Sequence, residues 1–234
     1  MNVTGNMASG LHFSGVANIT GQSFGGLMAS GLLNVVGEHM NGLQIAGIAN
    51  ITASKLNGVQ VALCNYATKA RGLQIGLVNY YKEDMKGFQL GLVNANPDTR
   101  VQMMVYGGNA TPANIGVRFK NQLFYTILGV GSMYQGLNDK FSASASYRAG
   151  LSFPLYKGLS ISGDLGYQHI EAFDNKDEVI PKRLYALQAR ANLEYQFTKK
   201  FGIFATGGYG VTRFYNKSSN YDKGAIIEAG IVLF

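Results

Sequence analysis

The residues best placed for acid–base chemistry are His169 and Glu171, in the stretch "YQHIEAF" at 167–173. An imidazole beside a carboxylate supplies two members of a Ser-His-acid triad, in which the acid orients the histidine and the histidine activates a serine. Two residues that are two apart on a strand share one face, so the same pair also arises without catalysis. No serine motif accompanies this histidine, and we therefore expect no catalytic residue.

The other reactive side chains show no spacing that indicates a site. His12 and His39 do not stand at metal-ligand spacing with His169 or with Cys64, the only cysteine. Cys64 replaces an apolar position and is predicted to be a small core residue. The glycine-rich "GVGSMYQG" at 129–136 lies in a predicted strand and precedes no helix, so it fails the context test for phosphate binding. We expect no metal and no cofactor.

Composition favours β-structure and excludes several classes of protein. Charged residues make up 14% of the 234 positions, below the ~25% of a typical soluble protein. Apolar residues make up 47%, too many for a disordered chain. No apolar run approaches the ~18 residues of a membrane-spanning helix. With 31 glycines and 27 aromatic residues (14 Tyr and 13 Phe), a membrane β-barrel is indicated.

The positive charge does not indicate a nucleic-acid partner. Residues 1–99 carry five basic and four acidic side chains, and residues 100–234 carry 15 and nine, so the net charges are +1 and +6. The excess is dispersed and forms no basic–aromatic platform. Lysines in loops fit the phosphates of lipopolysaccharide better.

A short phrase recurs through the first 94 residues, as in "GLQIGLVN" at 72–79 and "GFQLGLVN" at 87–94. Its first glycines are spaced by 16, 16, 16, 14 and 15 residues, at Gly10, Gly26, Gly42, Gly58, Gly72 and Gly87. Apolar residues alternate within each unit, as in a strand. A unit this short suits one coil of a β-solenoid, in which neighbouring coils together bury the apolar face that one coil cannot bury alone.

Each unit ends on an asparagine, and these are predicted to stack as a structural ladder at one corner: Asn18, Asn34, Asn50, Asn65, Asn79 and Asn94. Asparagine side chains can pair the backbone groups of a buried turn and tolerate left-handed geometry. A glutamine ladder is predicted at another corner, from Gln44, Gln60, Gln74 and Gln89.

After "NANPDTR" at 94–100 the odd positions become apolar and the even positions polar. The alternation in "FSASASYRAGLSF" at 141–153 and "RLYALQARANLEYQF" at 183–197 lasts longer than the ~5–6 residues of an ordinary strand. It suits a barrel with lipid outside and a polar interior. Eight strands are predicted, at about 100–107, 112–119, 122–134, 141–153, 158–170, 183–197, 201–215 and 224–234.

The connections alternate between tight turns, at 120–122, 154–158 and 198–200, and longer polar loops, at 135–140, 171–182 and 216–224. This alternation is typical of periplasmic and extracellular ends. The solenoid is therefore expected on the periplasmic side, and the five residues 95–99 span at most about 18 Å, too little for independent tumbling.

If the apolar odd-numbered residues face the lipid, which we call the odd-outward register, the even-numbered residues face the lumen. This register predicts a charge network in the lumen, formed by Arg118, Arg148, Asp164, Arg190, Glu194 and Glu228, with Gln102, Gln168 and Gln188 beside it. An eight-stranded barrel is filled by its own side chains or by one small ligand. Charges in so narrow a space must be paired. The three arginines and three carboxylates therefore predict a structural plug.

The tandem "GLQIAGIAN" and "GLQIGLVN" units, followed by "LFYTILGVGSMY" and "LEYQFTKKFGIFATGGYG", resemble the surface-repeat outer-membrane proteins of Bacteroidetes-type bacteria. The resemblance covers nearly the whole chain and implies a location in the bacterial outer membrane; it implies no reaction. The surface label of this family suggests a solenoid on the outside of the cell, the alternative to the periplasmic placement that the strand count favours. The chain begins inside a repeat without a signal-peptide pattern, so we expect a mature form or a fragment.

The prediction is therefore an all-β chain, with a β-solenoid of about six 14–16-residue coils at 1–96 and an eight-stranded antiparallel transmembrane barrel at 97–234. The leading hypothesis is a non-enzymatic outer-membrane protein with a structural, adhesive or ligand-binding role. Its expected partners are outer-membrane lipid and lipopolysaccharide, with an unknown protein or glycan ligand as a further option and no nucleic acid. The alternatives are an outer-membrane lipid-modifying hydrolase and a small pore.

Overall fold

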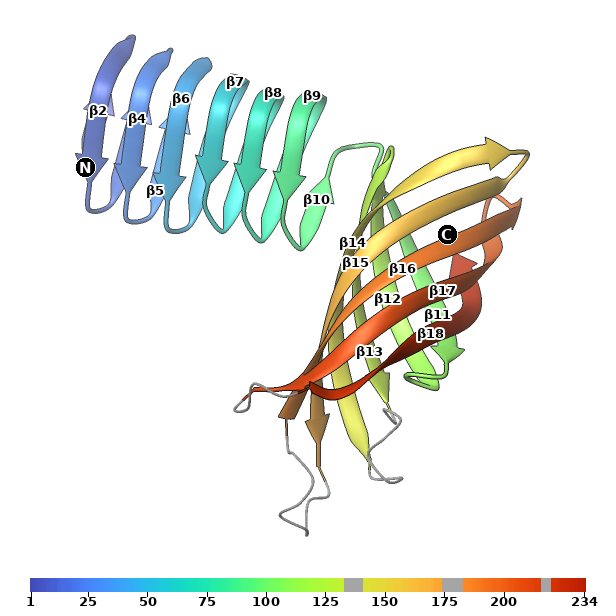
Figure 1. Cartoon of the computed structure of the whole chain (residues 1–234). Coiled ribbons are helices and arrows are strands. Elements are labelled where there is room, and N and C mark those ends of the chain that lie inside the picture. The colour runs from blue at the N-terminus through green and yellow to red at the C-terminus, as the bar shows by residue number, and fades with distance from the viewer. Residues whose placement is uncertain (133–140, 174–182, 216–219) are drawn as a thin grey trace. The chain divides into compact units, whose positions relative to one another are not determined.

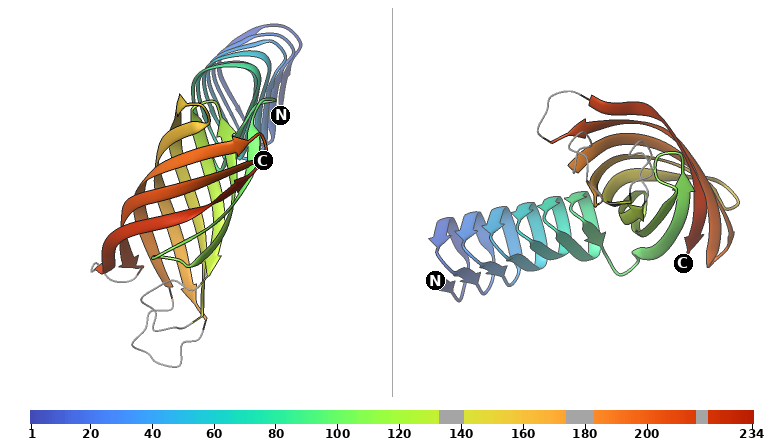
Figure 2. Two further views of the ribbon diagram at one scale, coloured as in Figure 1. Left: turned by 90° about the vertical axis from the view of Figure 1, so that its right-hand side faces the viewer. Right: turned by 90° about the horizontal axis from the view of Figure 1, so that it is seen from below.

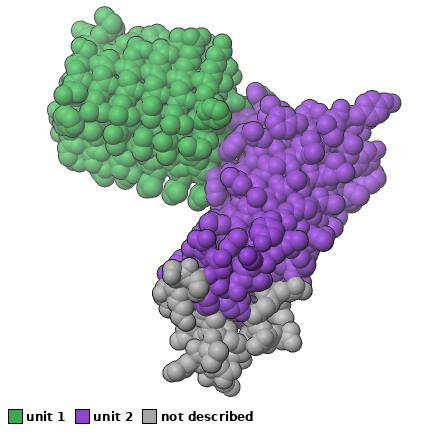
Figure 3. Space-filling view, in the orientation of Figure 1, with its two compact units in different colours: residues 1–99 green, residues 100–234 purple. Residues whose placement is uncertain are grey.

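The computed structural model describes residues 1–132, 141–173, 183–215 and 220–234, and every regular element in these ranges is a strand. The chain forms two compact units, residues 1–99 and residues 100–234 (Figure 3). The predicted fold class is confirmed, because the first unit is a parallel solenoid and the second a closed eight-stranded barrel. Among the described residues there is no helix long and apolar enough to cross a membrane.

The solenoid stacks its coils in parallel (Figures 1 and 2). Its strands are β1 (Asn2–Thr4), β2 (Ala8–Ser14), β3 (Ala17–Thr20), β4 (Phe24–Ser30), β5 (Leu33–Val36), β6 (His39–Ala46), β7 (Ala49–Val61), β8 (Cys64–Ile75), β9 (Val78–Leu90) and β10 (Val93–Ala95). These strands pair in two parallel rows, which we call the first and second ladder. The first ladder joins β1, β3, β5, β10 and the starts of β7, β8 and β9. The second ladder joins β2, β4, β6 and the ends of β7, β8 and β9.

The repeat phrase faces the opposite way from the prediction. Gln74 is fully buried, whereas Ile75 and Leu77 are 36% and 49% exposed. Because side chains alternate along a strand, the register that turns the glutamine inward turns its apolar neighbours outward. The apolar core between the two ladders comes from other positions, namely Phe24, Met28, Val36, Met40, Leu56, Ala67 and Ala70.

The repeated first glycine is required by the close stacking of the coils. Gly58 has φ +141°, and a Cβ built on it would overlap the carbonyl oxygen of Gly42 in the coil before. Gly42, Gly72 and Gly87 have the same left-handed backbone and meet the coil before them in the same way. Only glycine accepts this combination of φ and contact.

The barrel consists of β11 (Arg100–Gly108), β12 (Ala113–Asn121), β13 (Phe124–Ser132), β14 (Ser142–Tyr156), β15 (Leu159–Ala172), β16 (Arg183–Thr198), β17 (Phe201–Phe214) and β18 (Asn220–Leu233). All neighbours are antiparallel, and β18 pairs with β11 to close the ring. The three tight turns each leave two residues between strands, at 122–123, 157–158 and 199–200. Of the predicted longer loops, all of 135–140 and most of 171–182 lie outside the described residues. Of the third, 216–224, only 216–219 lie outside them, and β18 already begins at Asn220.

The odd-outward register fails on one strand. On β13 the odd residues Tyr125 and Ile127 are buried, while Val130 is exposed. The two-residue turn pairs Asn121 with Phe124, and this offset pairs even residues of β12 with odd residues of β13. Pairing with β14 restores the original parity, because Tyr125 lies opposite Gly150. The two-residue turns before β15 and β17 are accompanied by register shifts, at Pro154/Tyr156 and Gln196/Thr198, which restore the parity. The β12–β13 pairing has no such shift, so the prediction was wrong for this strand.

Candidate functional site

The barrel interior holds the densest group of charged side chains in the described chain. Its six charged members are all at most 8% exposed: Arg118 on β12, Arg148 on β14, Asp164 on β15, Arg190 and Glu194 on β16, and Glu228 on β18. The strand alternation turns them inward, where they meet although they are far apart in the sequence.

The structure brings these six residues together as three ion pairs, each with two parallel hydrogen bonds. Arg118 donates from Nη1 and Nη2 to Glu194, at 2.6 and 3.0 Å. Arg148 donates from Nε and Nη2 to Asp164, both at 2.8 Å.

In the third pair, Arg190 donates from Nε and Nη2 to Glu228, at 3.1 and 3.0 Å. Arg148 Nη1 also lies 3.6 Å from Glu228 Oε2, which links the second pair to the third. The fork of the guanidinium matches a carboxylate in this geometry, so the desolvated charges are compensated.

Asn192 and Tyr125 complete the network, and sequence reasoning missed both. Asn192 Nδ2 and the Tyr125 hydroxyl each donate to Asp164 Oδ2 at 2.8 Å. Asn192 Oδ1 accepts from Arg148 Nη2 at 3.1 Å and from the Thr206 hydroxyl at 2.7 Å. The parity change on β13 hid Tyr125, and turn length could not have revealed it, because all three tight turns have two residues and differ only in whether a register shift accompanies them. Asn192 already lay at an even position of β16, but it carries no charge.

The three predicted glutamines divide between two places. Gln102 accepts a hydrogen bond from Arg118 Nε at 2.6 Å and so belongs to the charge network. Gln188 donates to Gln168 at 3.0 Å, and Gln168 donates to the Ser144 hydroxyl at 2.8 Å, in a separate neutral group.

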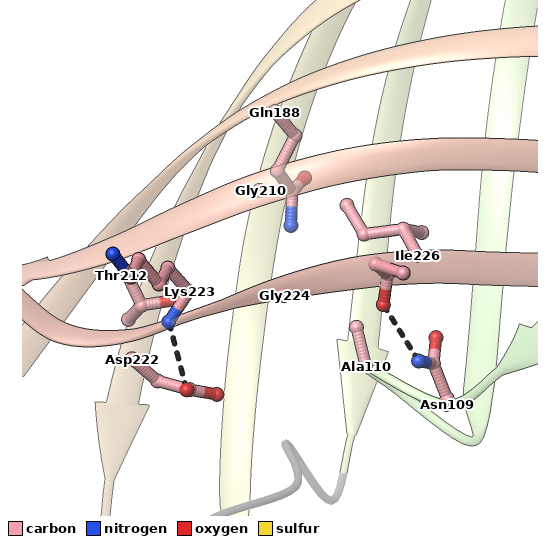
Figure 4. Close-up of a pocket in the computed structure, with 10 residues that line it drawn as sticks. Asn109, Ala110, Gln188, Gly210, Thr212, Asp222, Lys223, Gly224 and Ile226 are labelled. Carbon is pink, nitrogen blue, oxygen red and sulfur yellow. Dashed lines mark hydrogen bonds between the residues drawn. The ribbon is translucent and has the colours of Figure 1, made fainter.

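A cavity of about 460 Å³ occupies the end of the barrel opposite the tight turns (Figure 4). It is lined by Asn109, Ala110, Gln188, Gly210, Thr212, Asp222, Lys223, Gly224, Ala225 and Ile226. A second cavity, of about 360 Å³, lies at the tight-turn end and is lined in part by Arg100, Lys157 and Glu194. Along β16, Gln188 and Glu194 bracket Arg190 and Asn192, so the charge network lies between the two cavities.

The outer surface of the barrel is apolar between two groups of aromatic side chains. Leu165 is 72% exposed and Ile227 67%. Toward the tight turns lie the exposed rings of Phe153, Tyr156, Tyr195, Phe197 and Phe201. Toward the other end lie those of Phe141, Tyr167, Phe173 and Tyr215, with the half-buried ring of Tyr185 among them. The arrangement reverses that of a soluble protein, because aliphatic side chains point out and charges point in.

His169 and Glu171 lie on the outer face of the barrel, near the second aromatic group. The Nε2 of His169 is 3.3 Å from Glu171 Oε2, and its Nδ1 is 2.7 Å from the Tyr215 hydroxyl. Arg183 Nε donates to the same carboxylate at 3.0 Å. Both imidazole nitrogens therefore face residues other than serine.

In the solenoid, the six asparagines form a continuous ladder. Asn34 Nδ2 donates to Asn50 Oδ1 at 2.9 Å and to the carbonyl of Ile45 at 2.7 Å, and the same pattern recurs from Asn18 to Asn79. The Nδ2 of Asn94, the last member, donates to the carbonyl of Gly91 at 3.0 Å. Each of these buried amides thus pairs with its neighbours or with a carbonyl at the turn between coils.

The glutamines form a ladder of their own, with Nε2 to Oε1 distances of 2.8 Å from Gln89 to Gln74, Gln74 to Gln60 and Gln60 to Gln44. They do not lie at a corner, because they point into the solenoid from the middle of the second ladder. Cys64 is not a core residue either. It is exposed at the start of β8, where the row to which it belongs faces outward. No group of three His, Cys, Asp or Glu side chains within the described ranges could hold a metal ion.

No protein-family model matches the chain, and no curated protein matches it. Two solved structures are similar to its barrel. One is the N-terminal β-barrel domain of Pseudomonas aeruginosa OprF, with 16% identity and a TM-score of 0.37, covering 57% of this chain and 93% of that one. The other is Neisserial surface protein A (NspA), with 9% identity and a TM-score of 0.36, covering 57% and 92%.

Proposed function

We propose that this chain is a non-enzymatic outer-membrane protein whose barrel crosses the bilayer with its interior closed. One observation carries the proposal: the barrel exposes aliphatic side chains and buries three bidentate ion pairs. A closed barrel leaves no unpaired strand edge, as spanning a bilayer requires. Exposing the aliphatic outer surface of the barrel to water would be costly, whereas this surface suits the hydrocarbon core of a bilayer.

The two aromatic groups support the same placement. Tyrosine and phenylalanine rings form girdles at the two interfaces of outer-membrane barrels, with an apolar band between them. Here aromatic rings lie toward both ends of the barrel, with Leu165 and Ile227 among the exposed aliphatic residues on the strands. The partners of this surface are membrane lipid and, at the outer end, lipopolysaccharide.

The closed interior favours a structural, adhesive or binding role over a pore. The charge network separates the two cavities, and its groups pair with one another. In this role the solenoid, whose repeat units resemble those of Bacteroidetes-type surface-repeat proteins, is the part of the chain that would hold a protein or glycan ligand. A hydrolase is disfavoured, because His169 bonds to Tyr215 and Glu171.

Heat-modifiable migration on a denaturing gel tests the membrane barrel. Small membrane barrels resist unfolding by detergent, so boiled and unboiled samples should migrate differently. The matched control is the chain unfolded in urea before loading, which should run as the boiled sample does. Identical migration of boiled and unboiled detergent-extracted protein would count against the membrane barrel.

A further inference from the structure

The outward-facing side chains of the solenoid are sorted by polarity around its axis. Each coil turns twice. At the turn from the second ladder to the next coil, every coil exposes one aliphatic side chain, between 37% and 52% accessible: Val16, Leu32, Ile48, Leu63, Leu77 and Leu92. We call this row the apolar corner.

The rows on both sides of the apolar corner are also apolar. On the second ladder, registered pairing aligns Phe13, Ala29, Ile45, Val61, Ile75 and Leu90. On the first ladder it aligns Leu33, Ala49, Cys64, Val78 and Val93, in a row that begins at the buried Ala17. Three adjacent rows over six coils make one continuous apolar surface, which exceeds the scattered exposure of an ordinary soluble protein.

Charges gather at the opposite turn. All charged residues of the solenoid before the connection to the barrel lie at this turn or within three residues of it: Glu38, Lys55, Lys69, Arg71, Lys82, Glu83, Asp84 and Lys86. Lys69 and Glu83 form an ion pair there, at 3.2 Å. Between the two extremes, Tyr66 and Tyr80 stack with ring centroids 5.8 Å apart. Tyrosine at the boundary of an apolar and a polar zone is typical of a membrane interface.

We infer that the apolar corner of the solenoid inserts into the phospholipid surface of the membrane that holds the barrel. This inference rests on the proposed function. Beside its apolar core the solenoid buries two amide ladders, and at this corner it exposes aliphatic side chains, as the barrel does on its outer face. The apolar corner carries no charged group that could select a protein partner. The charged residues lie at the opposite turn, which faces water when the corner is in the membrane.

The connection that ties the solenoid to the barrel is short. β10 ends at Ala95 and β11 begins at Arg100, so four residues join the units and span at most about 14 Å. Arg100 begins β11 opposite Lys120, close to the tight turn at 122–123. The tight-turn end of such barrels faces the periplasm, where the leaflet is phospholipid.

The single cysteine allows a direct test, because Cys64 lies beside the apolar corner. The full chain is folded into phosphatidylcholine vesicles with an environment-sensitive fluorophore on Cys64. Two cysteine-relocated variants serve as controls: Cys64→Ala with Lys82→Cys at the charged turn, and Cys64→Ala with Leu165→Cys on the barrel wall. Quenching is measured with spin-labelled lipid and with aqueous iodide.

The Cys64 and Leu165 probes should be quenched several-fold more by spin-labelled lipid than the Lys82 probe, which iodide should reach. Raising the salt concentration should leave this pattern unchanged, since burial of apolar surface is not screened. The double substitution Ile48→Asp and Leu77→Asp changes two exposed side chains of the apolar corner. In this variant, aqueous iodide should quench the Cys64 probe.

Three results would overturn the inference, and they have different meanings. If lipid quenches the Leu165 probe but not the Cys64 probe, and iodide reaches Cys64, the barrel is in the membrane and the solenoid is not. If lipid fails to quench Leu165, the proposed function itself is wrong. If Cys64 is shielded from both quenchers and the protein self-associates, a second copy covers the corner.

Discussion

At the scale of single residues, the barrel interior depends on complete ion pairs. Arg190 and Glu228 are 8% and 3% exposed and joined by two hydrogen bonds. Neither charge has access to bulk water, so each depends on the other. Glycine makes room for such groups: a Cβ on Gly150 would come within 2.6 Å of Asp164 Cβ and 2.8 Å of Tyr125 Cζ.

Replacing Arg190 by Ala should lower the free energy of unfolding by about 3 kcal/mol, because it leaves the Glu228 carboxylate buried without its main partner. The measurement is a urea titration of the protein folded in vesicles. In the matched control, Arg190→Met with Glu228→Leu, the loss should be much smaller, since no charge is stranded and Arg148 keeps Asp164. Equal losses in the two variants would show that packing, and not charge pairing, matters at this position.

At the scale of elements, each coil of the solenoid is held to its neighbours by its asparagine. Asn50 donates to the carbonyls of Gln44 and Val61 and to Asn65 Oδ1, at 3.2, 3.0 and 3.1 Å. These bonds connect adjacent coils, so the array is stabilised by nearest-neighbour contacts.

Asn50→Ala should therefore destabilise the coils around it by about 2 kcal/mol, because buried carbonyls lose their donors. Amide hydrogen exchange of β6 and β8 measures the effect locally. Asn57→Ala is the control: Asn57 bonds to Asn41 in an exposed ladder at 2.8 Å and should cost less than about 0.5 kcal/mol. If both variants exchange alike, the buried asparagine ladder does not hold the coils together.

At the scale of the whole molecule, the closed interior predicts that the barrel conducts no ions. The purified protein should show no steady conductance in planar bilayers, because the charge network separates the cavities at the two ends. The folded fraction, measured by heat-modifiable migration, controls for failure to insert. Reproducible ion-selective channels would contradict the closed barrel and would make Arg118, Arg148 and Arg190 a filter.

The side of the membrane on which the solenoid lies is also testable. The eight-strand count and the tight turns predict a periplasmic solenoid, so protease added to intact cells should leave residues 1–94 uncut. Cells with a permeabilised outer membrane provide the control, in which cleavage should occur. Ready cleavage on intact cells would show that the solenoid lies on the cell surface and that the orientation is the reverse of the predicted one.

The amino-acid sequence by itself determined the elements. A period of 14–16 residues with a glycine and an asparagine in each unit predicts stacked coils, and long alternating segments predict eight barrel strands; the structure contains both. These properties follow from local geometry, because alternation and turn spacing are set along one strand at a time.

For the solenoid repeat and for β13, only the tertiary structure decided which face of the pattern lies inside. Alternation makes the two faces of a strand different but does not assign them, so Gln74 could be inward and Ile75 outward without a change in the pattern. A two-residue turn without the register shift that accompanies the other two tight turns set the parity of β13 and turned Tyr125 inward. The partners also depended on closure: Arg118 meets Glu194 because the ring brings β12 and β16 to the same level across a narrow lumen, although 76 positions separate them.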